Sequence, residues 1–162
     1  MLSQYTSALC REYTIACPAC NQDNLFPRLK RDIFRARTSE LDGHPLESSW
    51  RAENLEVPIW VTPLSFFWGV CSNCFYAGQL DEAEFRTWKK NATKFKNQFH
   101  EGILDNLAAQ AGPGQGFAQT LGRVIDPNDV YGTALIHFFL GIYTECLKTA
   151  PVSGTLARCY LR

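Results

Sequence analysis

Two pairs of cysteines, each with two residues between its members, constrain this chain more than any other feature. Cys17 and Cys20 form the first pair, and Cys71 and Cys74 form the second. This spacing lets a knuckle turn aim both sulfurs at one ion, and two knuckles complete a tetrahedral four-thiolate zinc site. We therefore predict that these four cysteines bind a structural zinc, which would contribute on the order of 10 kcal/mol to folding.

Other uses of the four cysteines are open at the level of sequence. Iron in a rubredoxin-like site is the redox alternative, because iron accepts the same four thiolates. Neither pair is followed by the glycine that would relieve the turn, since Asn21 and Phe75 stand there. Catalytic zinc is disfavoured because four thiolates leave no open position for a substrate. Four reduced core thiols that share this spacing by chance are the remaining alternative.

The other three of the seven cysteines are Cys10, Cys146 and Cys159. An odd total does not suit a disulfide framework. Cys146 and Cys159 lie in apolar, helix-like surroundings, so we expect them to be core thiols. The spacing of Cys10 gives no reason to expect a ligand.

The termini and the apolar runs predict a cytoplasmic protein that does not enter a membrane. The first 20 residues lack the basic segment and unbroken apolar stretch of a secretory signal. The longest apolar run, residues 134–143, would span only about half of a bilayer core as a helix.

Sixteen basic residues balance sixteen acidic ones, which disfavours binding nucleic acid or lipid through bulk charge. The charges are nevertheless grouped. Residues 26–37 carry five basic residues against one acidic residue, and residues 38–56 carry five acidic residues against one basic residue. We predict an exposed loop or short helix in which the two blocks pair. The basic block supplies the candidate nucleic-acid contacts Arg28, Lys30, Arg31, Arg35 and Arg37.

Tryptophans could assist such a contact by stacking on bases, and the candidates are Trp50, Trp60 and Trp68. The favoured interpretation is that they build the core of the sheet. The neighbouring acidic block would repel phosphate, which also weakens the nucleic-acid hypothesis.

Short apolar stretches predict strands around both cysteine pairs, at residues 13–16, 25–29, 57–61 and 66–70. From Asp81 onward, apolar residues recur every three or four positions as far as Leu107, which predicts one long helix. A flexible linker follows at residues 111–116.

Three further signals complete the helical part. Asp126–Pro127 predicts a second helix start, and residues 130–148 are apolar on several faces. Thr155–Arg162 predicts another helix, which has no stop signal, so we expect a truncated chain or a continuation beyond it.

Together these patterns predict an α+β protein. Residues 1–80 would form a zinc-ribbon-like domain with a small antiparallel sheet and an inserted loop at 26–56. Residues 81–162 would form a helical domain with a long helix and a helix-turn-helix.

Both knuckles and their flanks resemble the bacterial family known as domain of unknown function 2225. The matching residues are Cys17-Pro18-Ala19-Cys20 and Val70-Cys71-Ser72-Asn73-Cys74-Phe75-Tyr76-Ala77. Members commonly have glycine where this chain has Phe75. The resemblance implies a zinc-ribbon front joined to tetratricopeptide-like helices, and it brings no established activity.

The function that the sequence favours is a non-enzymatic adaptor stabilised by zinc. Residues 97–162 contain only nine charged residues, so an apolar helix there needs covering by other helices or by a partner. We therefore predict a protein partner, or self-association, through the helical part. A nucleic-acid-binding zinc ribbon is the second hypothesis. The third is an iron redox protein, or an enzyme that uses the insert around His44.

Overall fold

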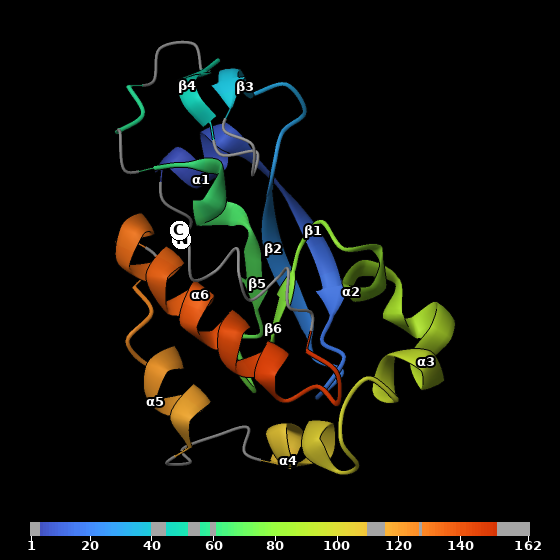
Figure 1. Ribbon diagram of the computed structural model, residues 1–162. Helices are drawn as coiled ribbons and strands as arrows, with labels where there is room; N and C mark the ends of the chain where they lie inside the picture. Colours follow the sequence, from blue (N-terminus) through green and yellow to red (C-terminus); the bar gives the residue numbers. More distant parts are fainter. Residues whose placement is uncertain are drawn as a thin grey trace.

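The computed structural model describes residues 4–39, 45–51, 56–58, 61–109, 116–126 and 128–151. In these ranges, three two-stranded antiparallel sheets pack with helices, so the predicted α+β class is confirmed (Figure 1). The first half contains α1 (Gln4–Leu9), β1 (Cys10–Ala16), β2 (Asp23–Leu29), β3 (Phe34–Ser39), β4 (Pro45–Trp50), η1 (Pro63–Phe66), β5 (Trp68–Val70) and β6 (Ala77–Gln79). The second half contains α2 (Ala83–Thr87), η2 (Trp88–Asn91), α3 (Ala92–Lys96), α4 (Ile103–Ala109), α5 (Phe117–Gly122) and α6 (Val130–Cys146).

Two hairpins occupy the centre of the structure. β1 pairs with β2 from Cys10↔Leu29 to Ala16↔Asp23, and the shorter β5–β6 hairpin lies beside it (Figure 1). Gly69 of β5 makes their close approach possible, because a Cβ atom there would lie 2.9 Å from the ring of Phe26 on β2. A cysteine pair lies at the tip of each hairpin.

The predicted loop or short helix at 26–56 is wrong for much of its length. β2 runs to Leu29, and β3 and β4 then form an antiparallel hairpin. The rings of Phe34 and Trp50 pack edge to face at its open end, 4.9 Å apart, and such cross-strand aromatic pairs stabilise a hairpin. Around the predicted strand at 57–61, residues 56–58 are irregular, and η1 precedes the three-residue β5.

The predicted long helix from residue 81 is broken into α2, η2, α3 and α4. Asn91 leaves the helical region with φ −146° and ψ 57°, and Gly102 has φ +77°, which glycine adopts without strain. The apolar face survives the breaks, since Phe85, Phe95 and Leu107 are all buried. At these breaks the chain changes direction, so that α2 and α3 form a short arm at one edge of the molecule (Figure 1).

The two predicted helix starts lie one and three residues early. α2 begins after Glu82, and Asp81 instead forms an ion pair with Arg28 at 2.8 Å. α6 begins after Asp129, whose carboxylate accepts a hydrogen bond from the backbone of Gly132 at 2.9 Å. This side-chain cap satisfies a helix donor that Asp126 lies too far upstream to reach.

α6 crosses the β5–β6 hairpin and is anchored there by close contacts (Figure 1). Gly141 lies against Trp68, so that a Cβ atom would come within 2.5 Å of the indole. The backbone N–H of Ala77 donates to the Thr144 hydroxyl at 3.2 Å. In the described chain, no helix has the length and apolar character needed to cross a membrane.

The proposed division near residue 80 stays a prediction. One buried cluster contains Cys17 and Cys71 together with Phe85 and Phe95, so the core is continuous across that position. Most of the linker at 111–116 and the predicted helix at 155–162 lie outside the described residues.

His137 of α6 gives the fold a pH dependence. Burial lowers its pKa to about 4 from 6.5, and a hydrogen bond to the backbone of Trp68 offsets part of this. The unfolded chain therefore binds a proton between these values that the folded chain does not. The contribution of His137 to the free energy of unfolding is fully present above pH 6.5. It falls as the pH is lowered toward 4, by a total on the order of 3 kcal/mol.

Urea unfolding at pH 7 and at pH 4.5 checks this expectation. The variant His137→Gln keeps every cysteine, so acid effects on the thiols affect both proteins alike. The loss of stability on acidification should be smaller in the variant. Parallel losses in the two proteins would show that His137 is not the source.

Candidate metal centre

The four paired cysteines, Cys17, Cys20, Cys71 and Cys74, converge on one point. Their sulfurs all lie within 4.8 Å of one another, and two contacts, Cys17–Cys74 and Cys20–Cys71, measure 3.6 Å. A disulfide needs about 2 Å, so these are separate thiols. Four sulfurs bound to zinc at about 2.3 Å would lie roughly 3.8 Å apart in a tetrahedron. The cluster thus has the size of a four-sulfur metal site.

The two knuckles repeat the same backbone pattern. In the first, the Cys17 N–H donates to Gln22 O at 2.8 Å, and the Asn21 N–H donates to Cys17 O at 2.9 Å. In the second, Cys71 and Phe75 make the equivalent bonds at 2.9 and 3.0 Å. Each hairpin therefore presents its two sulfurs in the same way, although 50 residues separate the pairs.

The residue after each second cysteine adopts a left-handed conformation. Asn21 has φ +59° and Phe75 has φ +58°. Asparagine tolerates this region, whereas a bulky residue enters it only at a cost of about 1–3 kcal/mol. The turn therefore keeps a backbone conformation that glycine would adopt without this cost.

Packing of the Phe75 ring holds this residue in its left-handed conformation. The ring packs against Gly122 of α5 so closely that a Cβ atom on Gly122 would lie 2.1 Å from it. The second knuckle is thereby fixed to the helical part of the chain.

Asn24 joins the two knuckles, and sequence reasoning missed it. Its side-chain oxygen accepts from the backbone N–H and the hydroxyl of Ser72, both at 2.9 Å. Its amide nitrogen donates to Gln22 O at 2.7 Å and to the Cys71 sulfur at 3.5 Å. Only 7% of Asn24 is exposed. The available signal was a polar residue one step before the apolar Leu25–Leu29 stretch.

Electrostatics in the cluster concentrate negative charge on Cys71. Contacts with Cys17 and Cys74, together with the backbone N–H of Asn73, lower the pKa of the Cys71 thiol. Contacts with Cys17 and Cys71, together with burial, raise the pKa of the Cys74 thiol. The thiolate form is therefore favoured at Cys71, and a bound cation would stabilise the charge of all four.

Cys10 and Cys146 lie apart from the cluster. Cys10 is buried in a second core with Leu9 and Val61, and burial raises the pKa of its thiol to about 12. Cys146 is exposed, so the expectation of a core thiol is wrong there. Its position on the outer face of α6 could not be read from an apolar sequence. Cys159 and His44 lie outside the described residues.

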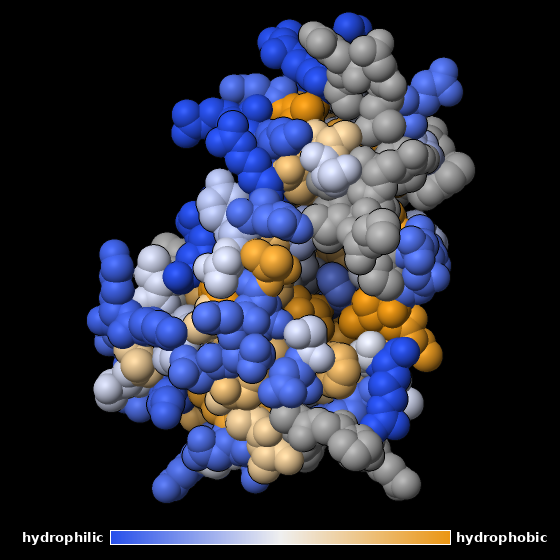
Figure 2. Space-filling view, turned by 180° about the vertical axis from the view of Figure 1, so that it is seen from behind, coloured by the Kyte–Doolittle hydropathy of each residue, from blue (hydrophilic) through white to orange (hydrophobic). Residues whose placement is uncertain are grey.

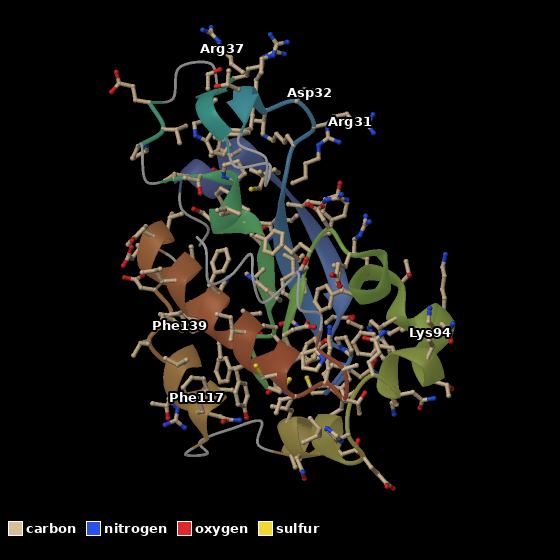
Figure 3. The ribbon with its side chains drawn as sticks, in the orientation of Figure 1. Arg31, Asp32, Arg37, Lys94, Phe117 and Phe139 are labelled. Atoms are coloured by element: carbon tan, nitrogen blue, oxygen red, sulfur yellow. The ribbon has the colours of Figure 1, made fainter. Side chains whose placement is uncertain are left out.

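Of the five predicted nucleic-acid residues, two make contacts within the molecule and three are exposed. Arg28 pairs with Asp81, and Lys30 donates to the backbone of Ala8. Arg31 and Arg37 extend into solvent at the far end of the molecule (Figure 3). Arg35 is exposed as well.

Two tryptophans of that hypothesis, Trp50 and Trp68, lie in the described part of the chain. Trp68 is only 4% exposed, and the indole N–H of Trp50 donates to Val61 O at 3.1 Å. The buried Trp68 offers no free face of the kind that stacking on bases requires, whereas Trp50 is partly exposed. Trp60, and most of the acidic block predicted to pair with the arginines, lie outside the described residues.

Comparisons with known proteins return no match. No family model, no curated protein and no solved structure is similar to this chain. The resemblance to domain of unknown function 2225 therefore stays a prediction that depends on the two knuckles.

Removal of one thiol tests the metal centre. Cys71→Ser should lose the bound metal and the cooperative thermal transition, because a structural zinc site contributes on the order of 10 kcal/mol. Metal per chain is measured by elemental analysis and folding by circular dichroism. Cys146→Ser is the matched control and should keep both. A normal melting curve of Cys71→Ser without metal would contradict a structural metal.

A double-mutant cycle tests the link between the second knuckle and α5. Gly122→Ala alone should destabilise the protein by about 1–3 kcal/mol, because the new methyl group collides with the ring of Phe75. In a Phe75→Ala background the same change should cost little, since alanine favours a helix over glycine. Denaturant unfolding of all four proteins gives the coupling energy. Additive effects would mean that the contact is not a constraint.

Proposed function

We propose that this protein is a non-enzymatic binding module whose fold is held by a structural zinc. The observation that carries the proposal is the group of four facing thiols, Cys17, Cys20, Cys71 and Cys74. Zinc bound by all four would have a closed ligand shell, with no position for a substrate or for an activated water molecule. Its role would then be to fix the two hairpins against each other.

An exposed apolar face on α6 supports binding of a protein partner. Tyr131, Leu135 and Phe139 recur every four residues, so they form one stripe along the helix, and 43–56% of each is exposed. Phe117 of α5 lies on the same side as Phe139 (Figure 3). Apolar groups gathered in this way favour an interface.

The chemistry of this face indicates the kind of partner. α6 contains a single charged residue, Glu145, and that residue is only 4% exposed. A charged group placed against the stripe would lose hydration and find no opposite charge. We therefore propose that the occupant is an uncharged, apolar helix face of another protein.

Site-specific photo-crosslinking in cells tests this proposal. A photoreactive phenylalanine analogue at position 139 should capture a discrete protein, and Leu135→Asp should abolish the capture. Placement of the analogue at Leu25, which is 63% exposed on β2, is the matched control because Leu25 lies outside the stripe.

Two results would contradict the proposal. Equal capture at positions 25 and 139 would mean that the stripe is not a specific interface. An adduct between two copies of the chain would replace the partner with self-association, which light scattering of Leu135→Asp and the unaltered protein would verify.

A further inference from the structure

We infer that the α2–α3 arm, residues 83–96, binds single-stranded nucleic acid. The arm is the most basic stretch in the second half of the chain. Five cationic residues fall within eleven positions, and the sequence has no acidic residue between Glu84 and Glu101. The structure places all five at the surface: Arg86, Lys89, Lys90, Lys94 and Lys96.

The arm stands apart from the surface proposed for the protein partner. Lys94 points outward at one edge of the molecule, whereas Phe117 and Phe139 lie at the opposite edge (Figure 3). Seen from behind, the edge formed by the arm is covered by hydrophilic side chains (Figure 2). The two surfaces can therefore bind different ligands.

Two acidic groups beside the arm pair with cations outside it, and Glu84 is the one acidic residue in the sequence of residues 83–96. Asp81 contacts Arg28 at 2.8 Å, and Glu145 contacts Lys148 at 2.6 Å. The net charge of zero therefore conceals a local positive field, which is what attracts a polyanion.

A small notch in the arm has the lining of a nucleobase site. Its volume is about 140 Å³. The walls carry an indole, a phenyl ring, two amides, a hydroxyl and two amines: Trp88, Phe95, Asn91, Gln98, Thr87, Lys90 and Lys94. A flat base can lie against the indole, amides can bond to its edge, and amines can contact the flanking phosphates.

Trp88 is held rigidly enough to serve as a platform. Its indole N–H donates to the carbonyl of Ala16 at 2.7 Å, directly before the first cysteine of the metal centre. The ring is also only partly buried. A preorganised aromatic ring loses little conformational entropy when a base stacks on it.

Single-stranded nucleic acid fits this arrangement better than other polyanions. An acidic peptide would contact the amines, but its carboxylates would not lie against the indole in the notch. A duplex keeps its bases stacked and paired, so it could use only the phosphate contacts. The lining of the notch therefore predicts that the binding affinity depends on unpaired, accessible bases.

Fluorescence anisotropy with labelled oligonucleotides tests the inference on the full chain. A twelve-nucleotide oligothymidine should bind at low salt and weaken as salt rises. An abasic oligomer with the same phosphates should bind about tenfold more weakly, because stacking contributes about 1–3 kcal/mol per base. A duplex of equal length should also bind more weakly.

Charge-neutralising variants locate the site. Lys90→Gln/Lys94→Gln should reduce affinity about tenfold and lower the salt slope by about 1.4, at roughly 0.7 for each lost phosphate contact. Arg35→Gln/Arg37→Gln removes the same charge from the β3–β4 hairpin and should change affinity less than twofold. Both pairs are exposed, so both variants should fold.

Four outcomes would overturn the inference. They are absence of binding at 50 mM salt, equal affinity for the abasic oligomer, equal affinity for the duplex, and equal losses in the two variant pairs. None of these measurements depends on the apolar face of α6, so the proposed function is tested separately.

Discussion

The convergence of four thiols from two distant hairpins is the contact on which the rest of this structure depends. Packed thiols attract one another weakly, and removing protons from them in a buried site would leave several negative charges side by side. The hydrogen bonds from Asn24 and Asn73 to Cys71 compensate for one such charge. A divalent cation would compensate for the others, so the arrangement gains stability when a metal is bound.

The rest of the chain is attached to these knuckles at separate points. Phe75 packs on Gly122 of α5, and Trp88 donates to the carbonyl of Ala16. Because each attachment lies within a residue of a cysteine, disorder at the metal centre would reach both the helices and the arm. Loss of metal should therefore affect distant surfaces as well as the two hairpins themselves.

Spacing in the sequence was sufficient to predict that the four cysteines meet, because two-residue gaps admit few turn geometries. It could not reveal Asn24, whose importance depends on a partner 48 positions away. The β3–β4 hairpin was missed because its strands contain few apolar residues, and the short alternation Phe34-Arg35-Ala36-Arg37 was interpreted as part of a charge block. The breaks in the predicted long helix were missed because the apolar period continues through Asn91 and Gly102, where backbone conformational preference ends the helix.

The separation of the two proposed surfaces follows from the same architecture. An apolar stripe and a lysine-rich arm would interfere if they were adjacent, since burying the stripe would desolvate the lysines. Here the central hairpins lie between α6 and the arm (Figure 1). A partner on α6 would leave the notch beside Trp88 open. The metal centre would thus support two independent contacts through one rigid core.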